Sequence, residues 1–309
     1  DRIHCFRGGN KNFFSTFRLA IRMKETVDYN LLSHCAAQAM VRYPYFCVRP
    51  AREGETLVLR YNDQPLPVFP DDRTVTLGSE ESRGHLISFG CKDKTIFIDA
   101  SHYIADGMGI DPLMKTLLYL YASKCYGIEG LATERIRMPD SPVFDGEYAY
   151  PFPDRVIEAE DIDIIPEEPK EVYGLEREAF DKDGFYAYHL HIPQKEMMAK
   201  ASSSDGSPVS FLSVLLYRAF HRLDQNIDKP VVAHVQHQYR AALRTPMSHH
   251  SLVSYIPVVL APRLNKWDVE KQNTVVRGQV ILKGVHDADM APVNRLIEAF
   301  PSEASFTAR

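Results

Sequence analysis

Strand and helix patterns alternate on both sides of one segment of different composition, residues 137–184. That segment is rich in Pro, Asp and Glu, a composition typical of a crossover or linker. Interspersed strands and helices bury their apolar faces by packing helices against sheets. The sequence therefore predicts an α/β protein of two α+β layered halves. Residues 1–160 form the N-terminal half, residues 161–184 an acidic crossover and residues 185–309 the C-terminal half.

The N-terminal half contains helix and strand patterns in alternation. Apolar residues recur at helical spacing over residues 27–41, and Tyr43-Pro44 ends this helix because proline disfavours helix at the residue before it. Residues 57–61 and 95–99 have the alternation or the β-branched and aromatic content of strands. A second helix is predicted to begin at Asp111-Pro112, with Asp111 as its N-cap and Pro112 in its first turn.

The C-terminal half repeats this combination. Ser207-Pro208 again places an N-cap before a proline, and the apolar residues that follow predict a helix to Leu223. The other predicted elements are strands over residues 186–192, 231–237 and 252–260, and helices over residues 267–282 and 292–300.

Composition excludes several classes of protein. The formal net charge of -5 provides no broad basic field, so nucleic acid is not an expected partner. No apolar run is long enough to span a bilayer, and residues 1–4 do not resemble a secretory signal. The five cysteines are scattered without a Cys-x-x-Cys pair, which favours a reducing, cytoplasmic setting over a disulfide framework.

One segment combines a buried strand with residues that can carry chemistry. The strand over residues 95–99 leads into Ser101-His102, and Asp106-Gly107-Met108-Gly109 follows before the next helix. Functional side chains are often found on connections that a rigid scaffold holds. A histidine titrates near neutrality, so His102 can accept a proton from a hydroxyl, an amine or a thiol. Asp106 can either fix this loop or orient the imidazole. Gly107 and Gly109 permit positive φ and a close approach of backbone.

The other histidines are weaker candidates. His249 and His250 are adjacent, so in a strand their side chains would point to opposite faces. His286, Asp287 and Asp289 lack a fixed metal-ligand spacing, which indicates a polar loop. The sequence predicts no metal site.

His102-x-x-x-Asp106-Gly107 after a buried strand resembles the HxxxDG signature of the CoA-dependent acyltransferase superfamily. The segment Arg42-Tyr43-Pro44-Tyr45-Phe46 and the later strand that ends near Arg240 are similar to its alcohol acetyltransferase and condensation-domain branch. The resemblance covers most of the chain. It implies two chloramphenicol acetyltransferase-like halves, each a mixed sheet flanked by helices, with a channel between them.

The resemblance also implies roles for single residues. His102 would be the general base of an acyltransferase, and Asp106 would form a structural ion pair with Arg240, or with Arg244 as the alternative. Gly107 would let the loop pass close to the substrate tunnel, and Ser254 is a candidate oxyanion donor. Acyl-CoA or an acyl carrier protein would deliver the thioester as co-substrate, and a small alcohol or amine would accept the acyl group. No permanently bound cofactor is implied.

Several departures keep alternatives open. Ser101 stands where condensation domains carry a first histidine, and the plant-type Asp-Phe-Gly-Trp-Gly motif is missing. Family members usually continue past the position of Arg309, so the resemblance implies a truncated second half. The alternatives are a non-catalytic binding or structural member of the fold, a condensation-type domain of a natural-product pathway, and a hydrolase in which His102 activates water.

Overall fold

The computed structural model describes residues 16–53, 56–127, 136–151, 169–174, 190–241 and 243–284. The chain divides into two compact units. Unit 1 comprises Asp1–Val156, Tyr239–Leu252 and Asn294–Arg309, and unit 2 comprises Ile157–Gln238 and Val253–Val293. The loop Tyr239–Leu252, which the sequence analysis placed in the C-terminal half, therefore belongs to unit 1.

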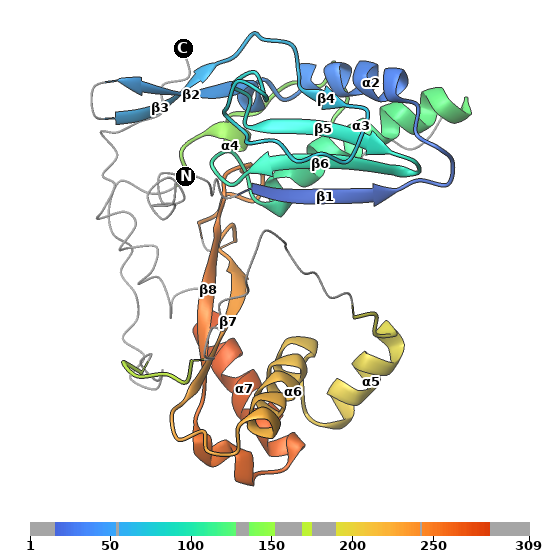
Figure 1. Ribbon diagram of the computed structural model, residues 1–309. Coiled ribbons are helices and arrows are strands. Elements are labelled where there is room, and N and C mark those ends of the chain that lie inside the picture. Colours follow the sequence, from blue (N-terminus) through green and yellow to red (C-terminus); the bar gives the residue numbers. More distant parts are fainter. Residues whose placement is uncertain are drawn as a thin grey trace, which may run out of the picture. The chain divides into compact units, whose positions relative to one another are not determined.

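Unit 1 is built on a mixed four-stranded sheet of order β1-β6-β5-β4 (Figure 1). These strands are β1 (Thr16–Arg22), β6 (Thr95–Ser101), β5 (Ile87–Lys92) and β4 (Val68–Phe69). All neighbours are antiparallel except β4 and β5, which are parallel. β6 lies between β1 and β5 and is the strand predicted over residues 95–99. Its central position in the sheet gives the residues after it a rigid support.

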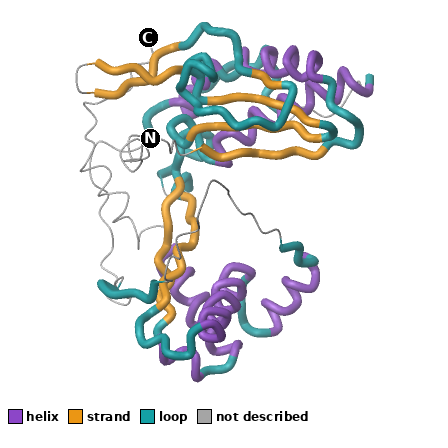
Figure 2. The backbone as a smooth tube through the Cα atoms, viewed as in Figure 1, coloured by secondary structure: helices purple, strands orange, loops and turns teal. Residues whose placement is uncertain are grey.

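Two helices lie against this sheet. α2 (Tyr29–Val41) matches the helix predicted over residues 27–41 and packs on β5 and on α3 (Gly107–Tyr126). Asp28 caps α2, because its side chain accepts the N–H of Leu31. After α2 the chain forms the short helix η1 (Pro44–Phe46) and the hairpin of β2 (Val48–Glu53) and β3 (Thr56–Tyr61). Figure 2 shows the helices and strands of this layered α/β unit.

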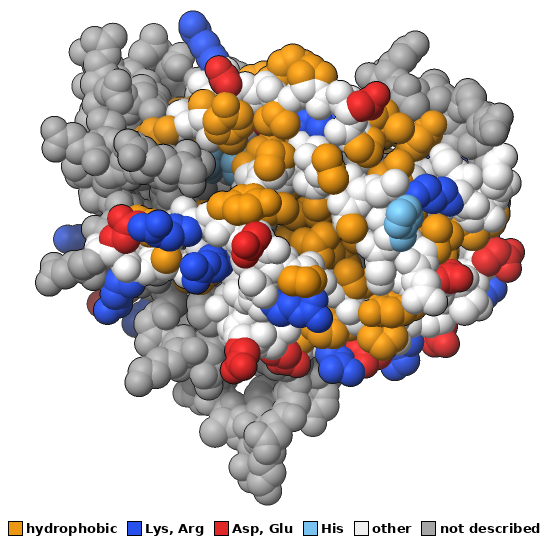
Figure 3. Space-filling model, turned by 90° about the horizontal axis from the view of Figure 1, so that it is seen from above, with side chains coloured by type: hydrophobic (Ala, Val, Ile, Leu, Met, Phe, Trp, Pro, Cys, Tyr) orange, Lys and Arg blue, Asp and Glu red, His pale blue; other side chains and the backbone are white. Residues whose placement is uncertain are grey.

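The core of unit 1 joins α2, α3 and the inner face of the sheet. Its fully buried side chains include Leu32, Phe89, Ile98 and Leu117. On the face seen in Figure 3, hydrophobic side chains are interspersed with charged side chains of both signs.

The prediction for the start of α3 was wrong. The helix begins at Gly107 with Asp106 as its N-cap, and Pro112 lies inside it. The Asp106 side chain accepts the N–H of Gly109, and its carbonyl accepts the N–H of Ile110 at 3.0 Å. Pro112 offers no N–H to the helix, but the cap at Asp106 starts the helix upstream of this proline. The helix therefore reaches back almost to His102.

Unit 2 contains a two-stranded antiparallel sheet, β7 (Val231–Gln238) and β8 (Val253–Leu260), as predicted. Its helices are α5 (Gln194–Ser203), α6 (Pro208–Leu223) and α7 (Val269–Gly284), with η2 (Pro262–Lys266) after β8. Ser207 forms a capping box with Ser210 at the start of α6, which confirms the Ser-Pro prediction. The Gln279 side chain on α7 binds both the N–H and the carbonyl of Val259, so it satisfies backbone groups of β8 at that residue.

Some predictions fall outside the described residues. These are the helix over residues 292–300, most of the strand over residues 186–192 and most of the crossover over residues 161–184. None of the helices in the described ranges is long and apolar enough to cross a bilayer. The fold is mixed α/β with sheets flanked by helices, as the sequence predicted.

Candidate active site

His102 is the first residue of a tight turn at the end of β6. The turn is held by Ser101, which is fully buried. The Ser101 hydroxyl accepts the N–H of Tyr103 at 3.2 Å, and the Ser101 carbonyl accepts the N–H of Ile104 at 3.0 Å. Ser101 thus fixes the backbone on which His102 is mounted.

The His102 ring is half-buried and packs at 4.7 Å, centroid to centroid, from the ring of Phe17 on β1. Burial lowers its pKa below the ordinary value, because it disfavours the imidazolium. The charge of Asp106 and a hydrogen bond with the backbone of Ala105 oppose this effect and do not cancel it. At neutral pH the imidazole is therefore mostly neutral, which is the form that can accept a proton.

Asp106 is buried and ties three segments of unit 1 together. Its Oδ1 accepts the N–H of Gly109 at 2.8 Å, and its Oδ2 accepts the N–H of Leu252 at 3.1 Å. Arg240 donates to both oxygens, Nη1 to Oδ2 and Nη2 to Oδ1, each at 2.7 Å. Of the two roles left open for Asp106, these bonds are those of a residue that fixes the loop.

Arg240 follows β7 and is itself held by backbone carbonyls. Its Nε donates to Ser248 at 3.0 Å and its Nη2 to His250 at 2.7 Å. The guanidinium is nearly buried, with 6% of its side chain exposed. The structure thus brings Arg240 to Asp106, while the alternative partner, Arg244, lies on the surface.

The sequence leads us to expect a close approach of backbone at Gly107 and Gly109, and the structure shows one at Gly109. The passage of the loop at Gly107 close to a substrate tunnel stays a prediction. A Cβ on Gly107 would meet open space, and Gly107 does not have a positive φ. A Cβ on Gly109 would lie 2.0 Å from the carbonyl oxygen of His249. The first turn of α3 therefore packs backbone to backbone against the loop that holds Arg240, and only glycine leaves room for this contact.

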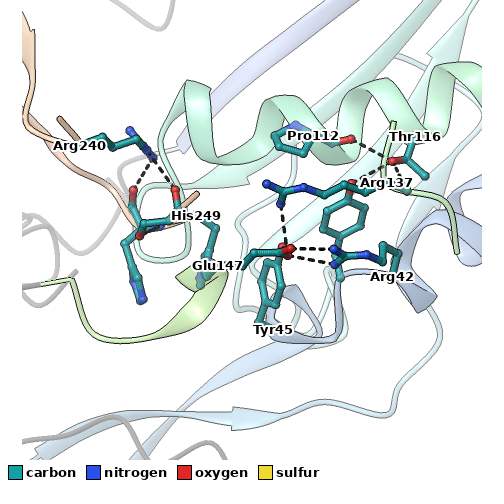
Figure 4. Close-up of polar contacts among 11 residues, drawn as sticks. Arg42, Tyr45, Pro112, Thr116, Arg137, Glu147, Arg240 and His249 are labelled. Atoms are coloured by element: carbon teal, nitrogen blue, oxygen red, sulfur yellow. Dashed lines mark hydrogen bonds and ion pairs between the residues drawn. The ribbon is translucent and has the colours of Figure 1, made fainter. Parts of the chain in front are cut away.

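Sequence reasoning missed Glu147, which lies in the segment interpreted as a linker. It is fully buried on the short helix α4 (Asp145–Tyr148). Arg42 binds its carboxylate through two hydrogen bonds of 3.0 and 2.7 Å, Tyr45 donates at 2.8 Å, and Arg137 lies at 3.2 Å (Figure 4). Nothing in the acidic composition singles out Glu147, although Arg42 and Tyr45 belong to the motif-like segment after α2.

Sequence reasoning also dismissed His249 and His250, because it assumed a strand. Both lie in the loop between β7 and β8, and their rings stack at 4.2 Å. The backbone N–H and the ring Nδ1 of His249 both point to the carbonyl of Glu147. His249 therefore links the Glu147 cluster with the loop that carries Arg240.

Ser254 lies on β8 opposite His237 and belongs to unit 2. Its side chain lies outside what the structure describes, so the oxyanion role of Ser254 stays a prediction. Within the described ranges, no cluster of three or more His, Cys, Asp or Glu side chains is arranged to hold a metal ion.

Comparison with solved structures identifies the fold. The epimerization domain from the third module of tyrocidine synthetase B aligns with 96% of this chain and 73% of its own, at a TM-score of 0.59 and 14% identity. The first condensation domain of the CDA synthetase aligns with 89% of this chain and 72% of its own, at 0.58 and 13% identity. The chain has the fold of these epimerization and condensation domains.

A third structure with this fold is TRI101 of F. graminearum, complexed with coenzyme A and T-2 mycotoxin. It aligns with 96% of this chain and 77% of its own, at a TM-score of 0.53 and 11% identity. No family model matches this sequence, and no curated protein matches it. At these identities the likeness establishes the fold alone.

Proposed function

We propose that the protein transfers an acyl group from a thioester to an alcohol or amine, with His102 as the general base. The observation that carries this proposal is the position of His102 in the fold. His102 is a mostly neutral imidazole, mounted on a turn after a central strand and followed directly by a buried Asp106–Arg240 pair. A base that is fixed and deprotonated at neutral pH is what such a transfer requires.

The proposed reaction needs one proton acceptor that later becomes a donor. An imidazole nitrogen of His102 takes the proton of the acceptor O–H or N–H while the acceptor atom bonds to the thioester carbonyl carbon. The tetrahedral intermediate then collapses, its C–S bond breaks, and the imidazolium returns the proton to the departing thiolate. The products are an ester or amide and a free thiol. A hydrogen-bond donor must stabilise the oxyanion.

The donor would be an acyl-CoA or an acyl carrier protein. A solved structure of this fold contains coenzyme A, and others are domains of synthetases. Ser101 in place of the first histidine favours an acyltransferase over a peptide-forming domain, with a small alcohol or amine as acceptor. The proposed setting is the cytoplasm, because Cys35, Cys47, Cys91 and Cys125 are free thiols.

The test is thiol release from acetyl-CoA and longer acyl-CoA thioesters in the presence of mixed alcohols and amines. We expect release that depends on an acceptor and that falls by about 10²–10⁴-fold in His102→Ala. His102→Ala should keep the wild-type circular dichroism spectrum and melting temperature to within a few degrees.

Two outcomes would replace the proposal. Thiol release that needs no acceptor would make the protein a hydrolase in which His102 activates water. Thioester binding without release would make it a binding member of the fold.

A further inference from the structure

The Glu147 cluster is a buried ionic anchor in unit 1. Glu147 and Arg42 have 0% and 1% of their side chains exposed, and Tyr45 donates its hydroxyl to the same carboxylate. Burial alone would raise the pKa of Glu147, but the hydrogen bonds from Arg42 and Tyr45 and the charge of Arg137 hold it below its usual value. The carboxylate therefore stays ionised, and these contacts fix α4 against the segment that follows α2.

The main-chain carbonyl of Glu147 connects this anchor to the loop between β7 and β8. This carbonyl accepts the backbone N–H of His249 at 2.9 Å and also the ring Nδ1 of His249. Because a carbonyl only accepts, Nδ1 carries the proton. The His249 ring stacks on Tyr45 at 4.4 Å and meets the edge of Phe46 at 5.2 Å. Burial keeps the pKa of His249 well below its usual value, so the ring remains neutral.

His249 lies between the two residues whose carbonyls hold Arg240. Those residues are Ser248 and His250, and Arg240 in turn holds both oxygens of Asp106. The carbonyl of His249 itself lies against the backbone at Gly109, in the first turn of α3. Any shift of His249 therefore moves the acceptors of Arg240 and the surface on which α3 begins, directly after the His102 turn.

We propose that His249 is a positioning residue for His102, which it serves by fixing the Arg240 loop to the carbonyl of Glu147. This inference rests on the proposed function. The ring hydrogen bond is the part of the link that depends on a side chain, because the backbone N–H of residue 249 bonds to Glu147 whatever the side chain is. Without the ring donor the loop keeps its course but is held less closely, and geometry errors far from the chemistry reduce turnover.

The test uses two substitutions of similar size in the full chain. His249→Leu removes the ring donor, and His249→Asn keeps an N–H donor near the position of Nδ1. We expect His249→Leu to lower kcat about tenfold with little change in the KM of the acyl thioester, and His249→Asn to stay within about threefold of wild type. His249→Phe, which keeps a planar ring for Tyr45, replaces His249→Leu if the latter does not fold.

Leu32→Ala is the control for stability. It removes a buried side chain of α2 that belongs to the core and not to the Arg240 loop. At a temperature well below unfolding, Leu32→Ala should retain wild-type kcat even where it lowers the melting temperature as much as His249→Leu does. Wild-type kcat in His249→Leu, or equal losses in the Leu and Asn variants, would overturn the inference.

A second measurement separates this inference from the proposed function. If wild type itself releases no thiol with any acceptor, the proposed function fails, and the link is then tested through stability. His249→Leu and Arg240→Lys should be coupled in a double-mutant cycle. The unfolding constant of the double variant should differ from the product of the single effects by about threefold or more. Additive effects would show that His249 does not position Arg240.

Discussion

Among the described residues of unit 1, two pairs in which an arginine holds both oxygens of a carboxylate have both side chains buried, and they differ in what surrounds them. Asp106 and Arg240 bond largely to backbone, including the N–H of Gly109 and the carbonyl of Ser248. Glu147 receives side chains, from two arginines and Tyr45. The first pair therefore joins chain segments around His102, whereas the second anchors one short helix in the core. The same pair geometry thus serves two purposes, and the groups bonded to each pair show which purpose it has.

The largest effect on stability is expected from the Glu147 cluster. Glu147→Gln leaves Arg42 buried without its counter-charge, so we expect the free energy of unfolding in urea to fall by about 3–5 kcal/mol. The control is Glu53→Gln, which breaks the exposed pair of Glu53 with Arg60 and should cost less than about 1 kcal/mol. Equal losses of unfolding free energy in the two variants would show that the buried Glu147 cluster stabilises the protein no more than an exposed ion pair does.

A smaller loss of stability is expected at the other pair. In Asp106→Asn, Arg240 keeps the carbonyls of Ser248 and His250 as acceptors, so the loss should be about 1.5–3 kcal/mol. Acyl transfer should fall as well, because the His102 turn loses its support. Denaturation and thiol-release assays on one preparation measure both effects. If Asp106→Asn lowered stability but left acyl transfer unchanged, Asp106 would not be needed to support His102.

The contact between α3 and the Arg240 loop can be tested with two neighbouring glycines. Gly109→Ala places a Cβ against the carbonyl of His249 and should cost about 1–3 kcal/mol. Gly107→Ala meets open space in the first turn of the same helix and should be neutral or stabilising by up to about 1 kcal/mol. Melting temperatures of the two variants decide this. A destabilising Gly107→Ala would show that a Cβ at residue 107 meets a neighbour after all.

The smallest expected effect is a shift in pH dependence. Burial lowers the pKa of His102 and the charge of Asp106 partly restores it, so the pKa lies below the ordinary 6.5. Only the neutral ring accepts a proton, so kcat/KM should rise with pH through this pKa and level off above it. Asp106→Asn removes the restoring charge and should move the acid limb to lower pH, by less than about one unit. Glu147→Gln should leave the acid limb of kcat/KM at the same pH. A shift of this limb in Glu147→Gln would show that both carboxylates, and not Asp106 alone, act on the pKa of His102.

Local patterns predicted much of unit 1 and the hairpin of unit 2. The helix over residues 27–41, the strand over residues 95–99 and the Ser207-Pro208 helix start were confirmed, because apolar periodicity and caps act over a few residues. The start of α3 was predicted wrongly because two aspartates compete for the cap. Asp106 is chosen through contacts with Arg240 and Leu252, which are distant in sequence.

By itself the sequence determined the α/β class, the strand and turn that present His102, and a residue type suited to general base catalysis. Only the tertiary structure decided that Asp106 caps α3, that Gly109 rather than Gly107 needs to be glycine, and that Glu147 and His249 support the Arg240 loop. The physical reason is the sequence separation over which each effect acts. Hydrophobic periodicity and capping depend on residues that are close in sequence, whereas a buried charge meets its partner only when segments far apart in the chain pack together.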